Sequence, residues 1–116
     1  MTCAVDCGPV VNPAIIAAQM KGGVLMGLSA ALRERVDFAK GGVASSNFDN
    51  YELLRMNEIP GIEVHIVPSK EEMGGIGEVG LPPISPAVAN AVFQAAGIRV
   101  RRLPMLPAIL EGLKKR

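Results

Sequence analysis

An apolar segment of about twenty residues near the start of the chain constrains the fold more than any other feature of this sequence. It begins at Asn12 and Pro13, a typical helix start, because an asparagine side chain caps the first free N–H groups and proline fits the first turn. The apolar residues continue with helical spacing to about Arg33, which predicts a helix about 30 Å long. An element this apolar has to be covered by other parts of a fold.

Three glycines interrupt this predicted helix. Gly22, Gly23 and Gly27 each cost about 1 kcal/mol relative to alanine in a helix interior, so we expect a neighbouring element or a ligand to lie close against that face. Gln19 stands one turn before Gly23 on the same side, which directs an amide to the groove that the glycines open. A core glutamine with satisfied hydrogen bonds and a ligand-binding glutamine fit this position equally well.

The same segment is apolar enough to raise the question of a membrane span. Gln19, Lys21 and the glycines interrupt the run, and no aromatic residues anchor its ends, so we expect a buried helix and no membrane span. The first eleven residues contain an aspartate, two cysteines and a proline where a secretory signal has a basic and then an apolar region. The chain as given is therefore expected to be cytoplasmic.

Length and charge limit the remaining function classes. The 116 residues, 49% of them hydrophobic, are enough for a single domain, 1–116, with a core of its own. A net charge of +1, no basic stripe and four aromatic residues give little to hold phosphates or stack on bases, so we expect no nucleic-acid partner. The low aromatic content, 13 glycines and 9 prolines indicate a piece that packs against something larger.

The chain as a whole predicts an α+β fold, with a small mixed sheet of about four short strands, the long glycine-containing helix and one or two shorter helices. The expected extended segments are 2–6, a hairpin of 35–39 and 43–46 around a Gly41-Gly42 turn, 61–68, and 98–103. The expected further helices are 85–97, with an apolar stripe of Val88, Ala91, Val92 and Ala95, and 107–116. Residues 47–59 are expected to form an irregular polar connection.

Cys3, Cys7 and His65 do not predict a metal site. Four residues apart on a strand, the two cysteines would lie roughly 13 Å from each other, too far for a disulfide. With one histidine and no further cysteine in the chain, we expect neither a zinc nor an iron–sulfur site. His65 falls opposite the apolar face of its strand, beside Glu63, where a structural role is the more common one.

A glycine-rich segment, residues 74–80, holds one carboxylate, Glu78. Glycines let the backbone approach a ligand and expose its N–H groups, so Glu78 can be aimed at one point; the plainer alternative is a flexible loop with a solvated glutamate. Residues 75–80 also fit the GxGxxG dinucleotide fingerprint. In that fingerprint the glycine-rich turn is followed directly by a helix. Here the next predicted helix begins only at Ser85, after two prolines, so the dinucleotide-binding interpretation fails.

Several short motifs in this order and spacing carry a specific resemblance. They are Ala4-Val5-Asp6-Cys7-Gly8 with Val11-Asn12-Pro13; Gln19 with Gly22-Gly23 and Gly27-Leu28-Ser29; Ser46-Asn47-Phe48 with Tyr51 and Leu54-Arg55-Met56; and Gly75-Ile76-Gly77-Glu78 with Pro82-Pro83. From about Cys3 to Pro104 the chain resembles the C-terminal part of the molybdopterin-binding (large or beta) subunit of the xanthine dehydrogenase and aldehyde oxidase family. The isoquinoline 1-oxidoreductase beta-subunit type is the most similar. The implied fold is part of a molybdenum-cofactor-binding domain.

The resemblance implies part of a molybdenum hydroxylase, an oxidoreductase that inserts a water-derived oxygen at an aldehyde or aza-aromatic carbon. Glu78 matches the family's catalytic glutamate, which acts as the general base. Gln19 matches a glutamine that approaches the pterin cofactor, and Gly22 and Gly23 would let the cofactor lie close to the helix. Lys21 departs from the family pattern, in which an acidic residue is usual at that position.

The remaining cofactor contacts implied by the resemblance are the backbone groups of Gly75, Ile76 and Gly77. The cofactor of the complete enzyme is expected to be molybdenum–molybdopterin in the cytosine dinucleotide form. None is expected in the isolated chain, and no residue is expected to ligate a metal. The complete enzyme could be exported with signals absent from this chain.

The family's large subunit is several times longer than this chain, so the resemblance also implies partners. These are the remainder of the molybdopterin-binding subunit, a small iron–sulfur subunit and a small-molecule substrate. Alone, the chain is expected to be inactive and to form a homodimer that covers its apolar surface. The alternative is a non-catalytic fragment or remnant that folds and self-associates without cofactor.

Overall fold

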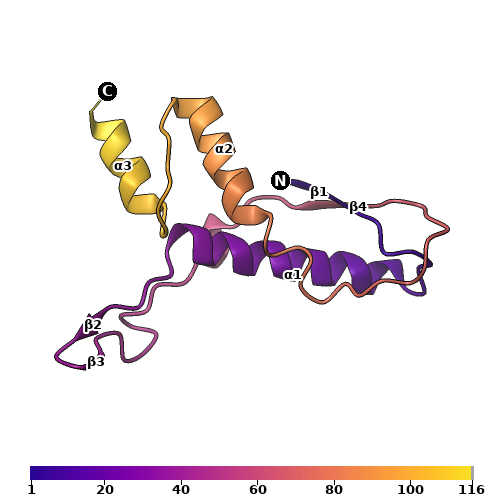
Figure 1. The fold of residues 1–116 in the computed structure, drawn as a ribbon, viewed down its shortest axis with the longest axis horizontal. Coiled ribbons are helices and arrows are strands. Elements are labelled where there is room, and N and C mark those ends of the chain that lie inside the picture. The colour runs from indigo at the N-terminus through magenta and orange to yellow at the C-terminus, as the bar shows by residue number, and fades with distance from the viewer. Residues whose placement is uncertain (116) are drawn as a thin grey trace.

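The computed structural model describes residues 1–115 and has the predicted α+β architecture (Figure 1). Its elements are β1 (Thr2–Val5), α1 (Pro13–Leu32), β2 (Phe38–Ala39), β3 (Gly42–Val43), the 3₁₀ turn η1 (Met56–Glu58), β4 (Glu63–Ile66), α2 (Ile84–Ala96) and α3 (Leu106–Lys114). The last helix thus ends before the predicted limit at Arg116, which lies outside the described residues. No strand forms at 98–103, where Val100 packs into the core instead.

The four strands of the described chain form two separate sheets, so the prediction of one mixed sheet is wrong. β1 and β4 pair in parallel, with Cys3 opposite Val64, and β2 and β3 pair antiparallel. A parallel pair needs a long crossover, which α1 and the following connection supply here. The β2–β3 hairpin extends away from the end of α1 and cannot reach the first pair (Figure 1).

The hairpin turn differs from the predicted one by a single residue. Ala39 pairs with Gly42, so the two turn residues are Lys40 and Gly41 rather than the two glycines. Lys40 has φ 52° and Gly41 φ 79°, and positive values at both central positions are typical of the tight hairpin turn whose twist matches its strands. Strand pairing therefore takes precedence over the glycine preference at the first turn position.

The long helix begins as predicted. The Asn12 side-chain oxygen accepts hydrogen bonds from the N–H groups of Ala14 at 3.0 Å and Ile15 at 3.3 Å. α1 ends at Leu32, within one residue of the expected limit. By length and composition α1 would suffice to cross a membrane, and in this fold its buried face forms the centre of the core.

The core consists of two clusters that both use α1. Their buried members are Val24, Leu28 and Ile84 in the first, and Ala31, Val100 and Met105 in the second. On α2, Val88 and Val92 pack as predicted, but Ala91 and Ala95 are exposed and Ala89 packs in their place. This part of the prediction is wrong because α2 meets two neighbours at once, which turns its contact face toward residue 89.

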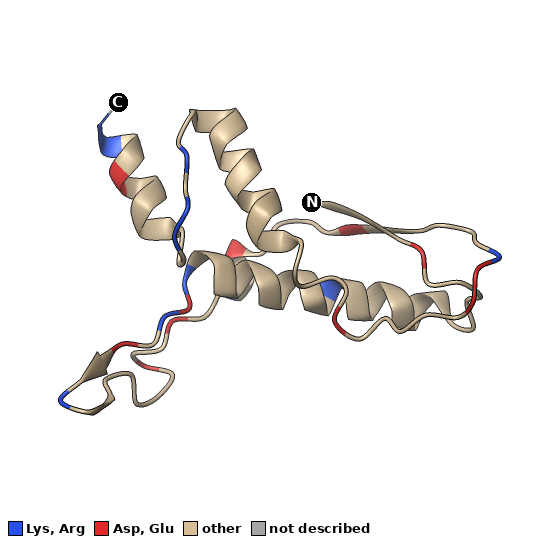
Figure 2. Ribbon diagram, viewed as in Figure 1, with Lys and Arg blue, Asp and Glu red and all other residues tan. Residues whose placement is uncertain are grey.

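Charges lie mainly in the connections between these elements (Figure 2). Lys21 is the one charged residue in α1, and α2 has none. Both cysteines are free, as predicted; β1 ends at Val5, so Cys7 lies beyond the strand and is buried.

Candidate cofactor-binding site

The loop segment, defined here as residues 74–81, runs alongside α1. At its start the N–H of Gly74 donates to the carbonyl oxygen of Cys7 at 3.0 Å. Ile76 then lines an apolar groove of about 280 Å³ together with Ile15 in the first turns of α1. The segment continues along the helix until it enters α2 (Figure 1). Two parts of the sequence that carry the predicted site residues therefore lie side by side.

Glycines make this close approach possible. A Cβ added to Gly23 would lie 3.3 Å from the Cα of Gly80, and one added to Gly27 would lie 2.8 Å from the oxygen of Leu81. From the other side, a Cβ on Gly80 would meet the carbonyl oxygen of Met20 at 3.0 Å. The neighbouring element expected against the helix glycines is therefore the loop segment itself, with backbone packed directly on backbone.

Gly22, Gly75 and Gly77 behave differently. A Cβ built on any of them would meet nothing within 4 Å, and none of the three has a positive φ. In the interior of α1 glycine costs about 1 kcal/mol relative to alanine, and the packing of the described residues gives no reason to accept that cost at Gly22. Gly75 and Gly77 lie outside the helices and strands. These positions leave open space along both α1 and the loop segment.

Gln19 and Gly22 share an open face of α1, which we define as Ile15, Gln19, Gly22 and Met26. Steps of four, three and four residues place them on one side of the helix. All four are exposed, Ile15 to 60% and Met26 to 63%. The alternative of a buried, satisfied core glutamine is therefore wrong for this chain, because the buried face of α1 lies on its other side.

Glu78 stands at the start of a tight turn in the loop segment. Its carbonyl oxygen accepts a hydrogen bond from the N–H of Leu81 at 2.9 Å, which fixes the backbone of the turn. Glu78 itself is exposed, as are Gly75 and Gly77, while Ile76 is half-buried. The main chain is thus anchored by packing, and the carboxylate is free to meet a group that approaches from outside this chain.

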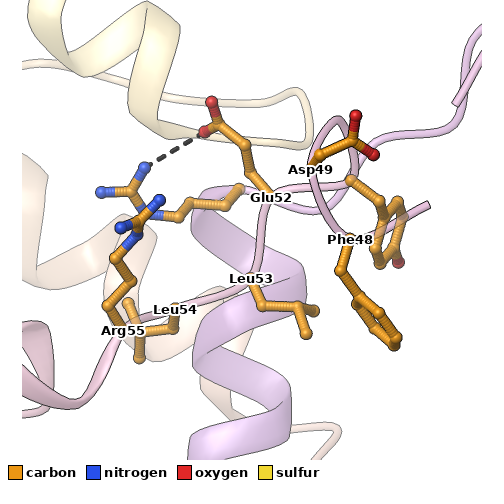
Figure 3. A pocket seen from close by; sticks show the side chains of 8 residues that line it. Phe48, Asp49, Glu52, Leu53, Leu54 and Arg55 are labelled. Carbon is orange, nitrogen blue, oxygen red and sulfur yellow. Dashed lines mark hydrogen bonds and ion pairs between the residues drawn. The ribbon is translucent and has the colours of Figure 1, made fainter.

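A second concave region, which the sequence interpretation did not identify, lies at the other end of α1 (Figure 3). Its volume is about 370 Å³, and it is lined by Arg33, Phe48, Asp49, Tyr51, Glu52, Leu53, Leu54 and Arg55. Arg33 pairs with Glu52 at 3.2 Å and also with Glu58. These ion pairs connect the end of α1 to the connection that follows it.

Tyr51 connects this second region to Glu34 by a hydrogen bond. Its hydroxyl donates a hydrogen bond to a carboxylate oxygen of Glu34 at 2.8 Å, and this bond raises the pKa of the tyrosine above its ordinary value of 10.0. The ion pairs and this hydrogen bond hold residues 47–59 against the helix. The family-resemblance motifs at 46–48 and 54–56 lie in this region and could have indicated it. The charged residues beside these motifs follow no spacing that is typical of a known kind of site.

None of the described residues forms a cluster suited to hold a metal ion. Among residues 1–115 no group of three or more histidine, cysteine, aspartate or glutamate side chains comes together. His65 is exposed, with Glu63 3.6 Å away.

Known proteins match both the sequence and the fold. The model of the molybdopterin cofactor-binding domain matches residues 1–60. Isoquinoline 1-oxidoreductase subunit beta from Brevundimonas diminuta is 48% identical over 109 residues, which cover 94% of this chain and 14% of the relative. The membrane-bound aldehyde dehydrogenase [pyrroloquinoline-quinone] from Gluconacetobacter polyoxogenes is 38% identical over 115 residues, 98% of this chain and 15% of that protein.

A solved structure has the same fold at low sequence identity. Quinoline 2-oxidoreductase from Pseudomonas putida 86 superposes with a TM-score of 0.83 over 97% of this chain and 16% of that one, with 21% identity. The chain thus spans about one seventh of the length of these proteins. Together with the sequence match over half of the chain, these similarities show that the chain belongs to the molybdopterin cofactor-binding domain family found in the molybdopterin-binding subunits of the xanthine dehydrogenase family.

Proposed function

We propose that this chain is the C-terminal part of the molybdopterin-binding subunit of a molybdenum hydroxylase, with Glu78 as its general base. The substrate class is a small aldehyde or aza-aromatic compound that is hydroxylated with oxygen from water. The observation that carries this proposal is the 48% identity, over 94% of the chain, to a subunit named for the oxidation of isoquinoline. The name of the second relative, an aldehyde dehydrogenase, supports an aldehyde as the alternative substrate.

The structure offers a physical test of whether the cofactor fits. Gly22, Gly75 and Gly77 leave space that no side chain of residues 1–115 fills, along the two segments that carry the proposed contacts. Missing side chains at such positions are suited to the close approach of a large planar group to the backbone. Gln19, exposed on the same side of α1 as Gly22, would supply an amide donor and acceptor.

In this proposal Gly23 acts first on the position of the loop segment. Its missing Cβ makes room for Gly80, so its first effect is to seat the loop segment rather than to touch the cofactor. The backbone N–H groups of Gly75, Ile76 and Gly77 would hold cofactor oxygens. Molybdenum–molybdopterin, when bound, would supply the Lewis acid that activates the water-derived oxygen and the acceptor for the electrons removed from the substrate; its cytosine dinucleotide form is part of this proposal.

The part played by Glu78 is to remove a proton from the oxygen nucleophile as it attacks the substrate carbon. A general base has to lie within hydrogen-bond reach of that proton, and the Glu78–Leu81 turn fixes the backbone from which the carboxylate extends. In this chain Glu78 is exposed to solvent. The cover that excludes water from it would come from the remainder of the subunit.

The shape of the chain supports a larger assembly. Its radius of gyration is 16.9 Å, whereas a compact domain of this length has about 13 Å. We therefore propose the remainder of the molybdopterin-binding subunit and an iron–sulfur subunit as partners. A cytoplasmic location of the chain as given is likewise a proposal, which cell fractionation would test.

The decisive experiment is a Glu78→Gln variant of the assembled native complex. The amide keeps the size of the side chain but cannot accept the proton, so we expect molybdenum content and assembly to be unchanged and turnover to fall by at least about 100-fold. Glu72→Gln, an exposed carboxylate a few residues earlier, is the matched control and should retain its turnover. Near-normal turnover of the Glu78 variant in a molybdenum-loaded complex would disprove the role.

The same purification tests the alternative of a non-catalytic fragment that self-associates. That alternative requires a metal-free homodimer from the native source. Because one relative is named for pyrroloquinoline quinone, the quinone should be assayed beside molybdenum on the same sample. Quinone without molybdenum would contradict the proposed cofactor.

A further inference from the structure

The β1–β4 pair is an incomplete sheet within the described chain. It consists of two strands of four residues each, paired in parallel. Parallel strands normally occur in larger sheets with both faces covered, and a sheet of two short strands is marginally stable. The pair therefore has an edge that another strand can extend.

The hydrogen bonds identify the open edge of β1. The carbonyl oxygens of Met1 and Val5 accept hydrogen bonds from N–H groups on the β4 side, at 2.9 and 2.8 Å. Main-chain groups of alternate residues face opposite edges of a strand, so those of Thr2 and Ala4 face away from β4. Both residues are exposed. Their N–H and C=O groups form a row that is available for pairing.

A groove of about 390 Å³ runs along this open edge. It is lined by residues 1–6 and by Met20, Val79, Pro83, Ile84 and Ala87. The side chains of these five residues are apolar and come from α1, the loop segment and the start of α2, while Asp6 adds one carboxylate to the lining. An extended peptide in this groove would find backbone partners on one side and apolar contacts below it, which is the arrangement of strand addition.

We infer that an extended strand from the remainder of the molybdopterin-binding subunit pairs with the open edge of β1 and fills this groove. The inference rests on the proposed function. The relatives are about seven times longer than this chain, so most of such a subunit lies outside it. The strand would carry small or apolar side chains at alternate positions, directed at Met20 and Ile84, because successive side chains of a strand point to opposite faces.

This added strand would act on the general base through its neighbour. Val79 follows Glu78, is 48% exposed, and forms part of the groove. A strand packed on Val79 would give the loop segment a second contact besides its packing against α1. The position of the Glu78 backbone would then depend on two contacts, one within this chain and one supplied by the rest of the subunit.

Amide hydrogen exchange of the assembled native complex tests the inference directly. We expect the amides of Thr2 and Ala4 to be protected to the same degree as those of Cys3 and Val5, which face β4. In a chain separated from its partners, Thr2 and Ala4 should exchange at least about 100-fold faster than in the complex. Fast exchange of both amides in a molybdenum-containing complex would overturn the added strand and leave the proposed function intact.

Two pairs of variants test the edge and the groove separately. Ala4→Pro removes the outward N–H and none of those that face β4, and we expect the yield of complex to fall at least about tenfold, while Ala4→Val keeps the N–H and should assemble. Ala87→Glu puts a charge into the groove and should reduce assembly to a similar extent. Ala91→Glu, one turn further on the exposed side of α2, should not. Normal assembly of both Ala4→Pro and Ala87→Glu would contradict the inference.

The remaining outcomes also decide between the proposals. Protection of Thr2 and Ala4 in a metal-free homodimer would identify a second copy of this chain as the occupant and overturn the inference. A native chain without partner polypeptides and without molybdenum would contradict the proposed function, and the inference with it.

Discussion

Gly23 of α1 and Gly80 of the loop segment are in direct backbone contact: a Cβ on Gly23 would lie 3.3 Å from the Cα of Gly80. The two residues are far apart in the sequence. Gly23 is needed because Gly80 is close, and Gly80 is needed because its Cβ would lie 3.0 Å from the carbonyl oxygen of Met20. Glu78 lies two residues before this contact. The position of the proposed general base is thus linked to a helix that contains no charged residue other than Lys21.

Gly27→Ala should destabilise the chain and displace the loop segment. Its Cβ would meet the oxygen of Leu81 at 2.8 Å and the Cβ of Ile84 at 3.0 Å, and such overpacking typically costs about 1–3 kcal/mol. Gly22→Ala, in the same helix, meets nothing within 4 Å and should instead stabilise by up to about 1 kcal/mol. Urea unfolding of the two variants measures both changes, and an equal effect of the two would contradict the packing argument.

Ser29→Ala should lower the free energy of unfolding by about 1–3 kcal/mol. Ser29 is 7% exposed, and its hydroxyl oxygen accepts a hydrogen bond from the N–H of Leu54 at 3.0 Å. Alanine leaves that N–H without its partner in a part-buried place. Ser85→Ala, a half-buried serine in α2, serves as the control in thermal unfolding, and a loss as large there would show that the hydrogen bond is not the cause.

Stability should fall in acid as Glu58 is protonated. The backbone N–H of Arg55 donates to this carboxylate at 2.9 Å, and with the neighbouring guanidinium of Arg33 it holds the pKa of Glu58 below its ordinary value of 4.5. A carboxyl whose pKa is lowered on folding stabilises the fold above its ordinary pKa, and the contribution is lost as the pH falls through the lowered value. Melting temperatures of Glu58→Gln should therefore depend less on pH below about 4.5.

The matched control for Glu58 is Glu72→Gln. Glu72 is also exposed, and its side chain makes no hydrogen bond or ion pair within the described residues. This variant should keep the acid dependence of the parent chain. If the Glu58 variant also kept it, the ion pairs at the end of α1 would have no part in acid stability.

Asn12→Ala should destabilise the start of α1 by about 1 kcal/mol. The Asn12 side chain accepts hydrogen bonds from two N–H groups of the first turn, and alanine cannot replace them. Asn12→Ser can, so it should retain most of the stability. Helix content from circular dichroism, followed during urea unfolding, distinguishes the two substitutions, and equal stability of both would exclude a capping role.

Local chemistry explains what the sequence predicted well. The cap at Asn12, the limits of α1 and the left-handed Gly97 after α2 depend on residues within a few positions of one another. The family resemblance also rests on short motifs in a fixed order. Features of this kind follow from local hydrogen bonding and backbone preference, which do not require knowledge of the rest of the fold.

Other features of the fold could not be predicted from local sequence, because they depend on contacts between distant parts of the chain. The hairpin turn moved by one residue because strand pairing determines which residues remain at the turn. The contact face of α2 depends on two neighbours at once, so Ala91 looked buried and is not. Whether four strands join one sheet or two depends on where α1 and its following connection place them.

By itself, the sequence of this protein determined its helices, its family and the presence of a carboxylate among glycines. The tertiary structure decided which glycines are needed for packing and which leave open space. Gly23, Gly27 and Gly80 are close to backbone atoms far away in the chain, whereas Gly22 and Gly77 face no neighbour. Each glycine carries the same intrinsic conformational freedom, so only the position of distant backbone atoms distinguishes the two groups.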